Sequence, residues 1–160
     1  MPSVETKYFG TLPYAEESVF SFPQGLPAFE DDKSFVLIQA PDQHEAPDRG
    51  SILFLQSMAR ASLCFVALPI LVVDGKYELA IAPEDLEELG LDVHRQPVLR
   101  EEVMVLALIS LYDKLPATAN LMAPVVLNVK TRRGLQAIRR DSRYSHAQPL
   151  GGEQTAGETC

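Results

Sequence analysis

The residue types that carry out enzyme chemistry are few in this chain of 160 residues, and their spacing fits no catalytic motif. No two of the histidines, His44, His94 and His146, have metal-ligand spacing, and we expect ordinary surface histidines. Cys64 lies in the apolar run LCFVAL, typical of a buried strand in which a thiol is inert, and Cys160 is the other cysteine. The motifs GxxxxGK[ST], GxGxxG and GxSxG are absent. We therefore expect no catalytic residue, no metal centre and no cofactor.

Adjacent carboxylates are the remaining candidates for acid–base or metal chemistry. They occur at Glu16-Glu17, Asp31-Asp32, Glu87-Glu88 and Glu101-Glu102. Acid–base catalysis needs carboxylates in contrasting environments, and we expect these pairs to be solvated. A metal-dependent enzyme with an acidic site stays open as an alternative on the sequence alone.

A basic stretch near the carboxyl end allows two interpretations. Six basic residues fall within fourteen positions: Lys130, Arg132, Arg133, Arg139, Arg140 and Arg143. They could form an RNA-binding patch, but Tyr144 is the only aromatic residue among them. We favour the other interpretation, in which they lie on the wet face of a terminal hairpin and pair with an acidic body.

That acidic body is the strongest compositional signal. The chain has a formal charge of −8, and residues 1–102 carry 18 acidic against 7 basic side chains. Such a surface repels nucleic acid and anionic membranes and suits a basic protein partner, although it also serves solubility alone. The longest apolar run, residues 103–111, is too short to span a bilayer, and the amino-terminal residues show no secretory signal. We expect a cytoplasmic protein with no membrane contact and no direct nucleic-acid partner.

Short strand-like runs bounded by Pro, Gly, Asp and Asn recur along the chain. We expect strands at residues 4–9, 18–22, 34–39, 51–57 and 63–68, a hairpin of 70–73 with 76–81 around Asp74-Gly75, and a last hairpin of 125–129 with 135–139. Residues 102–111 should form a strand that is buried on both faces, with a helix as the alternative. One short helix should begin at Pro83 and end at Gly90, with two acidic residues in its first turn.

These elements predict a mainly β fold, a small antiparallel β-barrel-like domain with one short helix, over residues 1–150. Residues 40–50 are polar and should form a surface loop. Residues 151–160, GGEQTAGETC, carry only small apolar side chains, and we expect a disordered tail.

Two segments identify a protein family more specifically than the overall composition does. One is FSFPQGLPAFE at residues 20–30; the other is NLMAPVVLN at 120–128, followed by Arg133-Gly134, Asp141 and Tyr144. Together with the opening VETKYFG they resemble the FliW family of bacterial flagellar assembly factors over residues 4–150. Ala28 departs from the family, which has glycine at this position of the loop, and glycine tolerates a positive φ far better.

The resemblance implies a non-enzymatic protein without a cofactor. Similar proteins bind a CsrA-type RNA-binding translational regulator, relieve its repression of flagellin synthesis, and bind flagellin as a chaperone. The two partners would then compete for one adaptor by mass action, directly or through coupled states.

From these motifs we expect partner contacts at Leu26, Phe29, Glu30, Glu87, Glu88, Asn120 and Leu121. Several have a structural alternative. Leu26 and Phe29 suit core anchors that hold the loop, and Asn120 suits a backbone hydrogen bond in a turn. Asn128 stands among valines and leucines, and if it is buried it must form hydrogen bonds.

Overall fold

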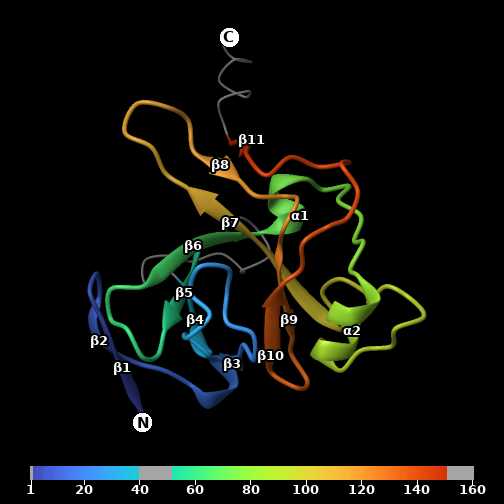
Figure 1. The fold of residues 1–160 in the computed structure, drawn as a ribbon. Coiled ribbons are helices and arrows are strands. Elements are labelled where there is room, and N and C mark those ends of the chain that lie inside the picture. The colour runs from blue at the N-terminus through green and yellow to red at the C-terminus, as the bar shows by residue number, and fades with distance from the viewer. Residues whose placement is uncertain (1, 40–51, 151–160) are drawn as a thin grey trace.

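A computed structural model describes residues 2–39 and 52–150 (Figure 1). The expected loop at 40–50 and the expected tail at 151–160 lie outside the described residues. In chain order the elements are β1 (Ser3–Thr6), β2 (Gly10–Pro13), the 3-10 helix η1 (Glu16–Ser18), β3 (Val19–Ser21), β4 (Ser34–Gln39), β5 (Leu53–Ser57), β6 (Cys64–Pro69), α1 (Ile70–Val73), α2 (Pro83–Leu89), β7 (Val103–Ser110), β8 (Thr118–Ala119), β9 (Val125–Asn128), β10 (Arg133–Gln136) and β11 (Gln148–Pro149).

Seven strands close into a barrel, which confirms the predicted fold class. They run β7-β6-β5-β4-β3-β10-β9, and β9 pairs back onto β7. Neighbours are antiparallel except β3 and β10, which meet in parallel where Ser21 is opposite Arg133. Closure gives both sides of β7 a partner in the barrel, β6 at its carboxyl end and β9 at its amino end.

The core has two parts that share strands β7 and β9. Alternate side chains of β7 point inward and outward. The inner set, represented by Leu106, packs in the barrel with Phe22, Phe35 and Leu127. The outer set, represented by Val105, packs under the segment from α1 to α2. Both faces are therefore covered, which is why the run at 103–110 is almost continuously apolar.

Smaller elements extend from the barrel (Figure 1). The β1–β2 hairpin forms a separate two-stranded sheet, tied to the barrel where the Phe9 and Phe54 rings meet edge to face. The antiparallel pair β8–β11 continues the sheet beyond the end of β7. Helix α2 lies beside the β9–β10 hairpin.

Three sequence predictions need correction. The hairpin expected at 70–81 is wrong, because 70–73 forms helix α1 and 76–81 forms no strand, so the described residues have two α-helices instead of one. The strand expected at 4–9 ends at Thr6 and pairs with β2, which the sequence did not predict. The last hairpin is confirmed, but its second strand is 133–136 rather than 135–139.

Candidate partner-binding surface

The loop that follows β3 is closely packed and closed by backbone hydrogen bonds. Gly25 adopts φ 65°, and a Cβ there would lie 2.6 Å from the Cα of Glu30, so only glycine permits this close approach. The amide of Phe29 donates to the carbonyl of Leu26 at 2.7 Å and closes a turn around Pro27 and Ala28. Leu26 is buried in the barrel core, so its side chain holds the loop in place.

Ala28 occupies the second central position of this turn with φ 74°. A positive φ at that position is the mark of a type II turn and normally selects glycine. The Ala28 amide donates to a carboxylate oxygen of Glu30 at 3.1 Å, which holds the strained turn closed. The loop thus holds Ala28 in a backbone conformation that favours glycine.

An ion pair beneath the loop fixes Phe29. The ring is half-buried, packs edge to face on Phe65, and lies under the guanidinium of Arg60. That guanidinium binds the carboxylate of Asp32, which is 2% exposed and also accepts the Ser57 hydroxyl at 2.7 Å. The hydrogen bonds from Arg60 and then Ser57 hold the pKa of Asp32 below its usual value.

Helix α2 faces this loop across a groove. Its apolar side anchors it through Leu86 and Leu89, which are buried, as the i, i+3 pattern predicts. Three carboxylates of its other side meet Glu30 of the loop in a groove of about 400 Å³. The lining residues are Gln24, Gly25, Pro27, Glu30, Glu84, Asp85, Glu88, Leu135 and Gln136, and we call this the acidic groove.

The acidic groove concentrates negative charge. Burial raises the pKa of Asp85, and the neighbouring Glu84 and Glu88 raise it further, while Arg140 acts in the opposite direction. A hydrogen bond from its own backbone amide, followed by one from Arg140, lowers the pKa of Glu84. Four acidic residues and no basic residue line the groove, although Glu84 also pairs with Arg140, so the groove is acidic overall and its charge favours a cationic group.

The structure brings together only some of the residues expected to contact a partner. Glu30 and Glu88 line the acidic groove, while Glu87 is exposed on the same helix outside it. Leu121, like Leu26, is buried in the core and is not available to a partner in this conformation. The amides of residues 122 and 123 donate to the Asn120 side-chain oxygen at 3.1 and 2.9 Å, so this residue shapes a turn.

The arginines of the basic stretch bind other residues of this chain. Arg139 is 4% exposed, stacks against the Tyr77 and Tyr144 rings, and binds Asp141 at 2.8 Å. The sequence predicted that Arg139 lies on a solvent-exposed face, and this prediction is wrong. The other arginines are exposed and pair as expected or bind backbone: Arg140 with Glu84, Arg143 with Glu78, Arg132 with the Glu16 carbonyl, and Arg133 with the Glu88 carbonyl.

Two of the adjacent carboxylates, Asp32 and Glu102, have arginine partners. Asp32 is buried, contrary to expectation, and its lowered pKa keeps it ionised, which is unfavourable for a general acid. The two carboxylate oxygens of Glu102 accept hydrogen bonds from two nitrogens of the Arg95 guanidinium, at 2.9 and 2.6 Å.

Within residues 2–39 and 52–150, no three His, Cys, Asp or Glu residues cluster as metal ligands. Burial raises the pKa of Cys64, so its thiol is a poor nucleophile.

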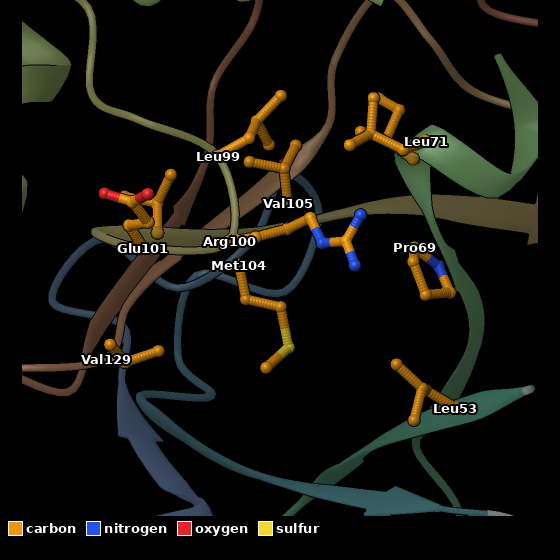
Figure 2. Close-up of a pocket in the computed structure, with 11 residues that line it drawn as sticks. Leu53, Pro69, Leu71, Leu99, Arg100, Glu101, Met104, Val105 and Val129 are labelled. Atoms are coloured by element: carbon orange, nitrogen blue, oxygen red, sulfur yellow. The ribbon is translucent and has the colours of Figure 1, made fainter. Parts of the chain in front are cut away.

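A second groove, of about 410 Å³, is mainly apolar (Figure 2). It lies between the end of β6, helix α1 and the start of β7, with Leu53, Leu99, Met104 and Val129 in its lining. The Arg100 side chain reaches across it from the turn before β7, toward the side of Pro69 and Leu71. This groove and the acidic groove share no lining residue.

Sequence reasoning missed both grooves. The acidic groove had one usable signal, because Glu84, Asp85 and Glu88 share a helix face at i, i+1 and i+4. The loop that faces them is more than fifty residues away in the chain, and no local pattern reports that contact. No local sequence pattern indicated the apolar groove, because its lining comes from segments as far apart as Leu53 and Val129.

Among the described residues, no helix has the length and apolar character needed to cross a membrane.

The family model described as FliW protein matches residues 3–150. The flagellar assembly factor FliW of Syntrophomonas wolfei is 33% identical over 143 residues, covering 88% of this chain and 83% of that protein. The protein of the same name from Bacillus subtilis is 31% identical over 150 residues, covering 94% and 97%.

The fold agrees with these sequence matches. A solved crystal structure of the flagellar assembly factor FliW superposes with a TM-score of 0.77 at 29% identity, covering 96% of this chain and 99% of that one. The family model match at residues 3–150 includes the barrel strands, helix α2 and the loop after β3. The chain therefore belongs to the FliW family of flagellar assembly factors.

Proposed function

We propose that this protein is a cytoplasmic, non-enzymatic adaptor that binds a CsrA-type translational regulator in the acidic groove and thereby relieves repression of flagellin synthesis. The observation that carries the proposal is the convergence of Glu30, Glu84, Asp85 and Glu88 in one groove. A regulator that binds RNA presents basic side chains, and these complement the groove.

Flagellin is the second partner in this proposal, and the apolar groove supports it. A filament subunit exposes apolar surface before it assembles, and a groove lined by Leu53, Leu99, Met104 and Val129 can cover such a surface. Because the two grooves share no lining residue, partner switching would act through coupled states rather than by direct overlap.

The RNA-binding alternative receives less support. The five arginines of the basic stretch contact carboxylates, tyrosine rings or backbone carbonyls, and these contacts would have to be given up to bind phosphates. A filter-binding salt series with flagellin messenger RNA would test the RNA alternative.

Two charge reversals on one helix test the acidic groove. Glu88→Lys changes a groove residue, and Glu87→Lys makes the same charge change outside the groove. We expect Glu88→Lys to speed dissociation of the regulator, whereas Glu87→Lys slows association alone, as measured by surface plasmon resonance. Equal effects of the two variants would contradict the groove as the binding site.

A competition experiment tests partner switching. Saturating flagellin should weaken regulator binding, and the regulator should weaken flagellin binding by the same factor. Val129→Asp should impair flagellin binding and spare regulator binding. Unchanged affinities with both partners bound would refute switching and leave the family fold intact.

A further inference from the structure

Helix α2 is too short to hold its own position. It has seven residues, and isolated helices below roughly 12–15 residues are marginal in water. Its N-cap residue, Ala82, offers no side-chain cap, and the Glu84–Arg140 pair near that end is exposed on both sides. Exposed ion pairs of this kind contribute little to stability. The position of the helix must therefore depend on its buried leucines and on its carboxyl end.

The carboxyl end is tied to the β9–β10 turn by side chains. The Leu89 carbonyl accepts the Asn128 side-chain amide at 2.7 Å and the Thr131 hydroxyl at 3.3 Å. The Glu88 carbonyl accepts the Arg133 guanidinium at 3.1 Å. Carbonyls of the last helical turn have no partner within the helix, so these bonds replace water there.

Asn128 is the centre of this connection. It is 3% exposed within β9, where neighbouring residues are apolar. Its side-chain oxygen accepts the Lys130 and Thr131 amides at 2.9 and 3.4 Å, so the same side chain shapes the turn and holds the helix. Both ends of a buried amide are thus satisfied, which makes its orientation unambiguous.

We propose that Asn128 is a positioning residue for partner binding. It fixes the carboxyl end of α2, and through it the acidic wall of the groove, at a set distance from Glu30 on the opposite loop. This inference rests on the proposed function, because it assigns a role in recognition of the basic regulator. It adds that recognition depends on a residue whose own side chain does not reach the groove.

Asn128→Asp and Asn128→Ala test the role. The first keeps an oxygen for the turn amides and removes the donor to Leu89, and the second removes both. Val36→Ala is the matched control, since Val36 is fully buried in β4 and lines neither groove. Under conditions in which all variants are folded by near-ultraviolet circular dichroism, we expect both Asn128 variants to bind the CsrA-type regulator at least tenfold more weakly and the control to bind as wild type.

A double-mutant cycle separates positioning from general destabilisation. Glu88→Gln should weaken binding in the wild-type background and have a smaller effect in the Asn128→Asp background, because the carboxylate is already displaced. Additive effects, or wild-type affinity in both Asn128 variants, would overturn the proposal.

Amide hydrogen exchange at the carboxyl end of α2 tests the positioning role without the regulator. The Gly90 and Leu91 amides donate to carbonyls of α2, and they should exchange at least tenfold faster in Asn128→Asp than in Val36→Ala. Unchanged exchange would refute the positioning role even if the wild-type protein binds the regulator. If the wild-type protein does not bind the regulator, the proposed function fails, while exchange still reports whether Asn128 holds the helix.

Discussion

Single residues set the shape of the loop that forms one wall of the acidic groove. Gly25 permits the approach of Glu30, Pro27 presets its own φ, and Ala28 adopts a conformation that costs an L-residue about 1–2 kcal/mol. The carboxylate of Glu30 accepts the Ala28 amide and so connects the strained turn to a groove residue. The Glu30 side chain thus both stabilises the strained backbone at Ala28 and contributes a negative charge to the acidic groove.

Ala28→Gly should stabilise the protein. Glycine removes the strain of φ 74°, and even after its larger unfolded-state entropy we expect a gain of about 0.5–1 kcal/mol in the free energy of unfolding, measured with urea. Ala15→Gly is the matched control, because Ala15 is also exposed but has φ −90°. It should be neutral or destabilising. A loss of stability in Ala28→Gly would show that the turn is not strained.

Glu102 should make stability depend on pH. The Arg95 guanidinium, followed by the Val98 amide at 2.7 Å, lowers its pKa to about 2 from an ordinary value of 4.5. A lowered pKa means that the folded state binds fewer protons, so the stabilisation is fully present above about pH 4.5 and is lost as the pH falls through about 2. Glu102→Gln should flatten the dependence of unfolding free energy on pH across this window.

Glu101→Gln is the control for that titration, since Glu101 is the exposed neighbour of Glu102. It should leave the slope as in the wild-type protein. The same slope in Glu102→Gln and wild type would mean that the contact with Arg95 does not persist in solution.

Among the elements, β7 does most to hold the two parts of the core together. Its alternate residues face the barrel interior and the layer under α1 and α2, so it joins two hydrophobic clusters. A strand covered on both faces has no solvent side, and truncation of either face should leave a cavity. The burial is uneven, however, because Leu106 is fully buried whereas Leu108 is only partly buried.

Leu106→Ala and Leu108→Ala should therefore differ. The first should cost about 2–5 kcal/mol, the usual range for a buried leucine, and the second about 1–2 kcal/mol because part of its surface is already hydrated. Urea unfolding of both variants measures the difference. Equal costs would contradict the partial burial of Leu108.

For the whole molecule, the distribution of charge should control association. Acidic side chains dominate residues 1–102, and the arginines beyond them are largely paired with acids or carbonyls. The rate constant for association with the basic regulator should fall by about tenfold between 50 and 200 mM salt, because steering is screened over about 10 Å at 0.1 M. Stopped-flow mixing at several salt concentrations measures this.

Flagellin provides the comparison within that experiment. The apolar groove carries one base, Arg100, and one acid, Glu101, in its lining, so association with flagellin should respond much less to salt. A matching salt dependence for both partners would indicate that they meet the same acidic surface.

Local patterns determined most elements of this fold. Helix α2 begins at Pro83 and ends before Gly90, as predicted. The apolar runs at 34–39, 63–68 and 103–111 form strands whose ends lie within a residue or two of the predicted ends. These signals are local because capping, turn chemistry and side-chain alternation act over a few residues. The family resemblance also lies in the sequence, since its two motifs stand in order along the chain.

Tertiary structure decided what local patterns left open. The apolar run at 70–73, which is rich in β-branched residues, becomes helix α1 because burial of Ile70 against the outer core overrides strand propensity. Arg139 is buried because its guanidinium packs on the Tyr77 and Tyr144 rings, which contact each other at a tilt, although Tyr77 is more than sixty residues away. The acidic groove likewise exists only because barrel closure brings the 24–30 loop opposite α2. Contacts over such separations depend on the closed barrel, and no short stretch of sequence encodes them.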